Sequence, residues 1–231
     1  MSVKNGRDYL YLVWKDNDTR RLFTVGQLSR NGQFEFSYGL EVKEAIEKGF
    51  NLLLPFPDID TVYECSKLFP VFSSRLPDRK RKGIEKILSK YGMDEYDEYT
   101  LLKRSGGSLP IDNLQFIDPI LPDDELPITR IFWLSGVRYY LGCAGVDCVK
   151  AIDCNVDETL YLVREPSNPK DAFAIKVLNS ANKLIGYIPR YYAKSISARL
   201  EKGAKYTCKV YEVKRENHCN ECIKVELVLN R

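Results

Sequence analysis

The sequence predicts an α+β protein with two domains, and three observations lead to this prediction. Hydrophobic residues make up 44% and charged residues 29% of the 231 residues, which is the composition of a folded globular protein. The segment 117–127 contains three prolines and four acidic residues, so it reads as an extended connector. Short apolar segments that predict strands occur on both sides of the connector, together with a few amphipathic helices. We therefore expect domains at residues 1–120 and 128–231.

The N-terminal domain is expected to be a small antiparallel sheet with helices. Three segments read as strands of one meander: 9–14, 22–28 and 33–38. Residues 41–48 predict a short helix, and Gly49 can end it in a left-handed conformation. Residues 79–90 predict a second helix with an apolar side and a basic side, ended by Gly92.

The C-terminal domain is expected to be a small β-barrel with one main helix. Six short segments read as strands: 129–134, 159–164, 173–178, 184–188, 206–213 and 223–228. Residues 189–201 predict the helix, because Pro189 suits a first helical turn and Gly203 suits the end. A closed barrel is one way for so many short strands to remove their exposed sheet edges.

The two halves of the chain differ in charge. Residues 1–127 hold 18 Lys and Arg against 21 Asp and Glu, a balance of −3, and residues 128–231 hold 17 against 11, a balance of +6. A basic domain favours a polyanionic partner. A charge of +6 is also ordinary for a domain of this length, so charge alone does not decide the partner.

The cysteines give little support for a metal site. Cys219 and Cys222 form a CxxC next to His218, the only histidine. A zinc knuckle requires a second pair of ligands, for which Cys208 is the nearest candidate. The remaining candidates are irregularly spaced: Cys143, Cys148 and Cys154. We therefore expect a turn between two strands that carries thiols, with no metal and no other cofactor.

The cysteines, the apolar segments and the first residues indicate where in the cell the protein is located. Seven cysteines without a regular framework fit free thiols in a reducing compartment. The longest apolar stretches are too short for a membrane span, and the first residues show no apolar segment typical of a secretory signal. We expect a cytoplasmic protein with no membrane contact.

One candidate binding segment is Ser-Gly-Val-Arg-Tyr-Tyr-Leu-Gly at residues 135–142. Aromatic residues in a loop bounded by glycines do not all belong to a core. Arg138 can pair with a phosphate, and Tyr139 and Tyr140 offer faces on which bases can stack.

Two further segments complete the candidate site. Residues 163–171 read Val-Arg-Glu-Pro-Ser-Asn-Pro-Lys-Asp, in which a strand leaves the sheet and Asp171 stands at the rim. Residues 185–193 pass from a strand directly into a helix, whose first turn can bind an anion with help from Arg190.

Together these three segments resemble the HIRAN domain, and the resemblance covers about residues 129–215. It implies a HIRAN-like barrel that grips the 3′ end of single-stranded DNA. Phosphate binding and base stacking are then implied for Arg138, Tyr139 and Tyr140, and Asn168 is included among the DNA-binding residues. Asp171 would accept a hydrogen bond from the terminal 3′-hydroxyl. Tyr187 and Arg190 would hold the terminal phosphates.

The physical chemistry of the site agrees with this resemblance. A carboxylate repels DNA phosphates but accepts a hydrogen bond from a hydroxyl, which a strand end supplies. Three positions depart from the family pattern: Lys170, Phe173 and Tyr187. These departures affect the expected selectivity for a free 3′ end more than they affect the expected binding of phosphates.

The N-terminal half resembles the N-terminal subdomain of the HipA-family toxin kinases, over about residues 9–117. The motifs that carry this resemblance are Thr-Val-Gly-Gln-Leu at 24–28, the aromatic segment 34–38, Leu-Leu-Leu-Pro-Phe at 52–56 and the segment 68–78. The kinase core does not follow, since the chain continues directly into the HIRAN-like half. The family pattern implies a separately encoded HipA-type kinase as the docking partner.

No set of catalytic residues is recognisable in the sequence. Ser105-Gly106-Gly107-Ser108 is too short for a phosphate-binding loop, and a lone histidine supports no nucleophilic triad. We expect a protein without enzymatic activity that binds DNA within a HipA-type toxin–antitoxin or defence module. One alternative is an antitoxin-like regulator of the kinase whose HIRAN half contacts protein. A nuclease or kinase subunit is the other alternative, and the missing acid, base and metal-binding residues count against it.

Overall fold

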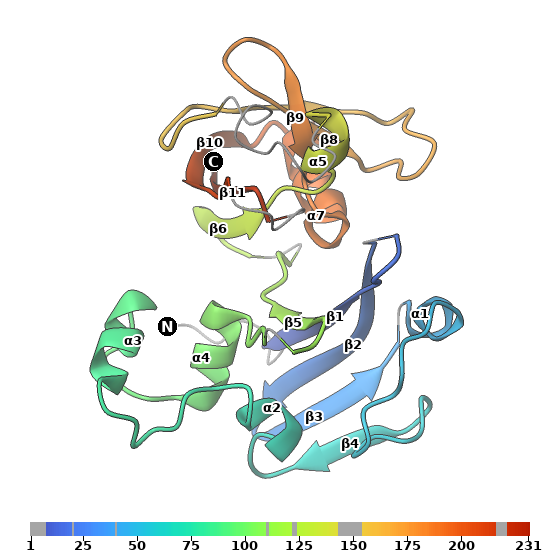
Figure 1. Cartoon of the computed structure of the whole chain (residues 1–231), viewed down its shortest axis with the longest axis vertical. Coiled ribbons are helices and arrows are strands. Elements are labelled where there is room, and N and C mark those ends of the chain that lie inside the picture. The colour runs from blue at the N-terminus through green and yellow to red at the C-terminus, as the bar shows by residue number, and fades with distance from the viewer. Residues whose placement is uncertain are drawn as a thin grey trace. The chain divides into compact units, whose positions relative to one another are not determined.

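The chain forms two compact units, Met1–Pro119 and Ile120–Arg231 (Figure 1). The computed structural model describes residues 8–19, 21–39, 41–109, 111–121, 124–142, 154–215 and 221–231. Within these ranges, all paired strands are antiparallel and helices are interspersed with them. The predicted α+β class is confirmed.

The first unit is built on one five-stranded sheet with the strand order β4-β3-β2-β1-β5. The strands are β1 (Tyr9–Lys15), β2 (Leu22–Asn31), β3 (Gln33–Tyr38), β4 (Val62–Cys65) and β5 (Leu114–Ile117). The predicted meander corresponds to β1, β2 and β3. Strand β4 was not predicted, because four residues at a sheet edge leave little alternation to detect.

The helices of the first unit are short. They are α1 (Val42–Glu47), α2 (Pro70–Ser73), α3 (Ile84–Lys90) and α4 (Glu98–Ser105). The prediction of a helix from residue 79 is wrong by five residues, because Gly83 has a left-handed φ of +81° and α3 begins only after it. Helix α4 was not predicted, although Asp97 caps it by accepting a 2.7 Å hydrogen bond from the Thr100 backbone N–H.

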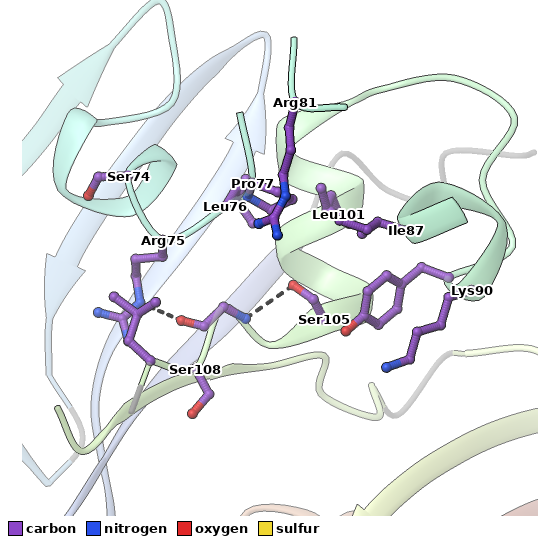
Figure 2. Close-up of a pocket in the computed structure, with 13 residues that line it drawn as sticks. Ser74, Arg75, Leu76, Pro77, Arg81, Ile87, Lys90, Leu101, Ser105 and Ser108 are labelled. Atoms are coloured by element: carbon purple, nitrogen blue, oxygen red, sulfur yellow. Dashed lines mark hydrogen bonds between the residues drawn. The ribbon is translucent and has the colours of Figure 1, made fainter. Parts of the chain in front are cut away.

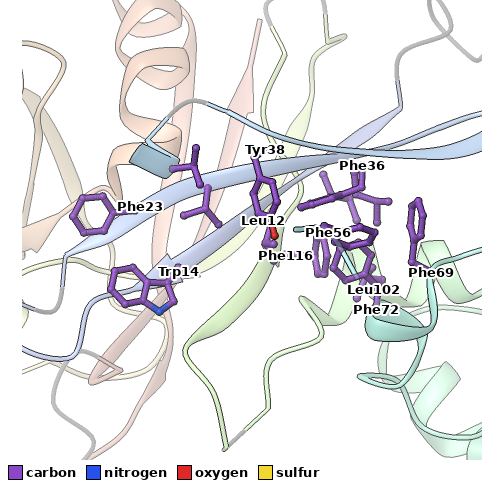
Figure 3. Packing of buried hydrophobic residues seen from close by; sticks show 14 of the residues in the cluster. Leu12, Trp14, Phe23, Phe36, Tyr38, Phe56, Phe69, Phe72, Leu102 and Phe116 are labelled. Atoms are coloured by element: carbon purple, nitrogen blue, oxygen red, sulfur yellow. The ribbon is translucent and has the colours of Figure 1, made fainter. Parts of the chain in front are cut away.

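Aromatic rings fill the core of the first unit (Figure 3). The ring centroid of Phe36 lies 4.5 Å from that of Phe56 and 5.2 Å from that of Phe72. Phe72 in turn packs edge-on against Phe116 of β5, with centroids 5.0 Å apart. Gly26 of β2 permits this packing, since a Cβ atom there would lie 2.9 Å from the Phe36 ring. The core therefore joins the sheet to the segments that follow it in the chain.

The second unit contains two three-stranded sheets, with the orders β10-β11-β6 and β7-β8-β9. Its elements are β6 (Ile128–Trp133), α5 (Val137–Tyr140), β7 (Tyr161–Arg164), β8 (Ile175–Leu178), β9 (Leu184–Tyr187), α7 (Arg190–Glu201), β10 (Lys205–Val213) and β11 (Ile223–Asn230). The predicted closing hairpin is the β10–β11 pair, and the predicted helix is α7 with Pro189 as its N-cap.

The predicted closed barrel is not supported, because no sheet formed by the described residues is closed. Among the described residues, the edges of the two sheets meet at two isolated bridges, Ser135 to Tyr187 and Thr159 to Lys209, with one further hydrogen bond from the Asp157 N–H to the Val210 carbonyl. Strands β7, β8 and β9 have four residues each, so the ladders of this sheet are short.

Helix α7 packs its apolar side into the second unit. Ile196 is fully buried, and the ring centroid of Tyr192 lies 5.2 Å from that of Phe132 on β6. Arg199 donates hydrogen bonds to the backbone carbonyls of Leu121 (2.6 Å) and Asp124 (3.1 Å), so the segment before β6 is attached to this helix. In the described parts of the chain, every helix is too short or too polar to cross a membrane.

Candidate nucleic-acid interface

Helix α5 sits directly on strand β9. Gly136 begins it with a left-handed φ of +73°, and the Ser135 and Tyr187 backbones exchange two hydrogen bonds of 2.8 and 2.9 Å. Gly186 allows this close approach. A Cβ atom at that position would lie 3.0 Å from the Ser135 carbonyl oxygen and 3.2 Å from Val137 Cγ2. The segment 137–140 is therefore a short helix, where the sequence indicated a loop.

Three tyrosines form a continuous row across α5 and β9, which we call the tyrosine row: Tyr139, Tyr140 and Tyr187. The rings of Tyr139 and Tyr140 meet edge to face with centroids 5.0 Å apart. Tyr140 and Tyr187 have centroids 5.2 Å apart and planes inclined by 42°. Tyr139 is 81% exposed and Tyr140 is 37% exposed, so the row presents aromatic surface to solvent.

Glu165 holds one end of the tyrosine row. Its Oε2 atom accepts hydrogen bonds from the Tyr187 hydroxyl at 2.8 Å and from Asn168 Nδ2 at 2.7 Å, and Lys176 Nζ lies 2.5 Å from Oε1. These three donors, Lys176 foremost, lower the pKa of Glu165 to about 2. Burial, the Glu165 carboxylate and Tyr140 raise the pKa of Tyr187 above its ordinary value. Tyr187 therefore remains a neutral hydrogen-bond donor beside an ionised acid.

The loop after β7 is held by its own polar side chains. Asn168 Oδ1 accepts hydrogen bonds from the backbone N–H groups of Lys170 (2.9 Å) and Asp171 (3.3 Å). Asp171 Oδ1 then accepts one from the Phe173 backbone N–H at 2.8 Å. This arrangement places the Asp171 carboxylate at the end of the loop, with one oxygen already used to shape it.

Cationic side chains lie on the same elements. Arg138 is exposed on α5, and Arg190 is exposed as the first residue of α7, three positions after Tyr187. On the next turn of α7, the Lys194 ammonium lies 5.6 Å from the ring centroid of Phe173, which is 42% exposed. Exposed aromatic rings beside cations are the chemistry with which proteins bind single-stranded nucleic acid.

Two family models match separate parts of the chain. Residues 21–110 match the HipA N-terminal domain, and residues 132–229 match the HIRAN domain. The chain joins a HipA N-terminal domain to a HIRAN domain. The candidate interface lies within the HIRAN domain. A search of curated proteins gave no significant match.

Two solved structures are similar to parts of this chain. The crystal structure of the HIRAN domain of human HLTF is 22% identical, with a TM-score of 0.34, over 44% of this chain and 74% of its own. The crystal structure of a protein from Lactobacillus plantarum is 18% identical, with a TM-score of 0.36, over 46% of this chain and 97% of its own. Each covers less than half of this chain.

The HIRAN domain connects most of the predicted site residues through direct contacts. Ring contacts join the tyrosine row, Glu165 links Tyr187 to Asn168, and Asn168 links to Asp171. Two residues of this network were not predicted, Glu165 and Lys176. The available signal was Lys176 itself, a charged residue inside the apolar strand β8.

The HipA N-terminal domain has an open pocket of about 470 Å³ between α3, α4 and the segment after α2 (Figure 2). Apolar side chains that include Leu76, Ile87 and Leu101 form its walls, and Arg81 and Lys90 supply positive charge. None of the described residues that line it is acidic.

A buried arginine fixes one wall of this pocket. Arg75 donates a 2.6 Å hydrogen bond to the Gly107 carbonyl and forms two bonds of 2.6 and 2.8 Å with the Asp112 carboxylate. Its side chain is only 6% exposed, so the wall next to Ser108 is held in place from inside the domain. The pocket is therefore a formed feature of the domain surface.

The possible metal ligands His218 and Cys219 lie outside the described residues. Within the described ranges, no group of three or more His, Cys, Asp or Glu side chains is arranged to hold a metal ion. Cys154, Cys208 and Cys222 are buried, and burial raises the pKa of Cys208 to about 12.

Proposed function

We propose that this chain binds the end of a single DNA strand through its HIRAN domain, docks a separate HipA-type kinase through its HipA N-terminal domain, and catalyses no reaction itself. A HIRAN domain suggests DNA binding, and a HipA N-terminal domain suggests a relation to HipA. The observation that supports DNA binding most directly is the tyrosine row, an exposed aromatic surface flanked by Arg138 and Arg190.

The elements of this interface have distinct chemical roles. The exposed faces of Tyr139 and Tyr140 are available for base stacking, which tolerates any sequence because every base has a π-face. Arg138 and Arg190 can each pair with a phosphate, and the N-terminal turn of α7 adds backbone N–H groups next to Arg190. The proposal therefore predicts binding without strong sequence preference.

Removing either arginine tests the phosphate contacts. The variants Arg138→Ala and Arg190→Ala should each weaken binding of every oligonucleotide sequence. Each should also reduce the slope of log affinity against log salt by about 0.7, because one phosphate contact is lost. Fluorescence anisotropy with labelled oligonucleotides across a salt series measures both quantities. Lys183→Ala is the matched control, since Lys183 is exposed and lies directly before β9. Equal slopes for all four proteins would contradict these phosphate contacts.

Asp171 provides the test for recognition of a strand end. Its carboxylate uses one oxygen for the Phe173 N–H and has capacity to accept a hydrogen bond from a terminal 3′-hydroxyl. Asp171→Ala should weaken binding of 3′-hydroxyl strands several-fold. It should leave 3′-phosphorylated strands unchanged or bound more tightly, because a repulsive charge has been removed.

The comparison of the two strand ends also tests the wild-type chain. Competition between 3′-hydroxyl and 3′-phosphate oligonucleotides of one sequence should favour the hydroxyl. Equal affinities would reduce the proposal to general single-strand binding. Absence of DNA binding would favour the alternative in which the HIRAN domain contacts protein.

The pocket of the HipA N-terminal domain is our candidate for kinase docking. Apolar walls with a positive rim fit an apolar side chain of the partner that has acidic neighbours. The double variant Arg81→Glu/Lys90→Glu should weaken binding of a HipA-type kinase core by about tenfold. Co-purification followed by titration calorimetry measures this effect.

A second double variant controls for net charge. Lys80→Glu/Lys86→Glu makes the same charge change on exposed residues that do not line the pocket, and it should bind the kinase normally. If both double variants bind equally well, the pocket is not the docking site. The same preparations test for activity, because phosphate transfer from ATP should appear only when the kinase is present. Phosphate incorporation by the chain alone would show that it is catalytic.

A further inference from the structure

A second group of aromatic and cationic side chains lies on the β10-β11-β6 sheet, and we call it the Trp–lysine cluster: Trp133, Tyr211, Lys214 and Lys224. The ammonium groups of Lys214 and Lys224 lie 4.7 and 5.3 Å from the ring centroid of Trp133. Lys224 is also 5.7 Å from the ring of Tyr211, which is 51% exposed. Trp133 and Lys224 are direct partners across the β6–β11 ladder.

The cluster is on the outer face of its sheet. Phe132 and Leu134, on either side of Trp133, are 4% and 1% exposed, and Ile223 and Val225 on either side of Lys224 are fully buried. Alternate residues of a strand point to opposite faces. Trp133 and Lys224 therefore project away from the core.

The backbone connects this cluster to the tyrosine row. The β6 ladder continues past Trp133, because the Leu134 N–H donates a 2.9 Å hydrogen bond to the Ile223 carbonyl. Ser135 then pairs with Tyr187 through two hydrogen bonds. Residues two apart in a strand share a face, and so do opposite residues of an antiparallel pair.

It follows that Trp133, Ser135 and Tyr187 project on the same side. At about 3.3 Å per residue, Trp133 lies about 7 Å along the strand from Ser135. The Trp–lysine cluster is thus the neighbour of the tyrosine row on one continuous surface.

We propose that the Trp–lysine cluster is a second stacking subsite, which binds a base of the same DNA strand next to the nucleotides held at the tyrosine row. This inference rests on the proposed function, because it needs a strand bound at the row. The indole of Trp133 offers the stacking surface, and Lys214 and Lys224 offer partners for the adjacent phosphates.

The acids around the cluster do not prevent such binding. Lys214 Nζ lies 3.8 Å from Glu221 and Lys224 Nζ lies 3.7 Å from Glu212, and both carboxylates are at least 40% exposed. Ion pairs this long and this exposed contribute little stability. A DNA phosphate can therefore replace either carboxylate as the partner of the lysine with little loss of free energy.

Tryptophan fluorescence can test the subsite, because the chain has two tryptophans. Trp14 is 9% exposed in the core of the HipA N-terminal domain, so Trp14→Phe leaves Trp133 as the sole emitter. An oligothymidine of about eight nucleotides should quench Trp133 emission, and a thymidine dinucleotide, whose two bases are held at the tyrosine row, should bind without quenching. If Trp14→Phe does not fold, the same comparison uses the wild-type chain against Trp133→Phe, in which the quenching should disappear.

The affinities for the longer strand and for the dinucleotide distinguish failure of this inference from failure of the proposed function. Trp133→Ala should bind the longer strand about 5- to 150-fold more weakly and the dinucleotide unchanged. If the dinucleotide binds and the longer strand neither quenches Trp133 nor depends on it, the subsite is disproved and the end-binding function stands. If neither strand binds the wild-type chain, both proposals fail. Binding of the longer strand through Trp133 without any effect of Tyr140→Ala would contradict the inference, because the strand would then not be held at the tyrosine row.

Discussion

Tyr140→Ala should lower the affinity of the HIRAN domain for single-stranded DNA by about 1–3 kcal/mol, or about 5- to 150-fold. Tyr140 is the central member of the tyrosine row, in ring contact with both Tyr139 and Tyr187. Its removal deletes a stacking surface and also takes away the ring against which Tyr187 rests. Fluorescence anisotropy with a short oligonucleotide measures the loss.

Two variants make this result specific. Tyr140→Phe keeps the ring and should bind almost as the wild type does, because stacking does not need the hydroxyl. Tyr161→Ala removes a tyrosine that is 50% exposed on β7, outside the row, and should leave binding unchanged. A Tyr140→Ala protein with wild-type affinity and a normal melting temperature would show that the row does not bind DNA.

Phe72→Ala should lower the free energy of unfolding of the HipA N-terminal domain by about 3–5 kcal/mol. Phe72 is 1% exposed and packs between Phe36 and Phe116, so its loss leaves a cavity that rigid aromatic neighbours fill poorly. Urea denaturation followed by the emission of Trp14, which belongs to the same core, reports on this domain. Introducing Trp133→Phe in all proteins removes the signal of the other domain.

An exposed residue of the same domain provides the control. Leu54 is 97% exposed, and Leu54→Ala should change the unfolding free energy by less than about 0.5 kcal/mol. A loss below about 1 kcal/mol for Phe72→Ala would contradict the packing of Phe36, Phe72 and Phe116 into one core.

Much of the fold could be predicted because the decisive information is local. The alternation of Phe34, Phe36 and Tyr38 marks β3, and the spacing of Ala193 and Ile196 after Pro189 marks α7. The start of α3 was misplaced because favourable helix residues at 79–82 precede a glycine that adopts a left-handed conformation. The closed barrel is not supported, and the sequence could not decide it because the length of a ladder depends on long-range pairing, which short apolar segments do not encode.

The candidate site was predictable as a set of segments and not as a network. Arginine and tyrosines between glycines indicate a binding surface by composition, and the Asn-Pro-x-Asp loop indicates a fixed turn. Glu165 was missed because a glutamate at the end of a strand usually faces solvent. Its role depends on Val163 pairing with Lys176 across β7 and β8, which brings the lysine within reach of the acid. Such a register cannot be read from either strand alone.

The two ends of the tyrosine row differ in how much order they already possess. The Tyr187 ring is held at its hydroxyl by Glu165 and against its face by Tyr140, so its rotamer is fixed before any ligand arrives. Tyr139, at 81% exposure, has one ring neighbour and keeps most of its rotational freedom. Ordering a loose side chain opposes binding by about 0.5–1.5 kcal/mol, and a preorganised one avoids that entropy loss. A base that stacks on Tyr187 therefore contacts a ring that is already immobilised. A base that stacks on Tyr139 must restrict the rotation of that ring when it binds.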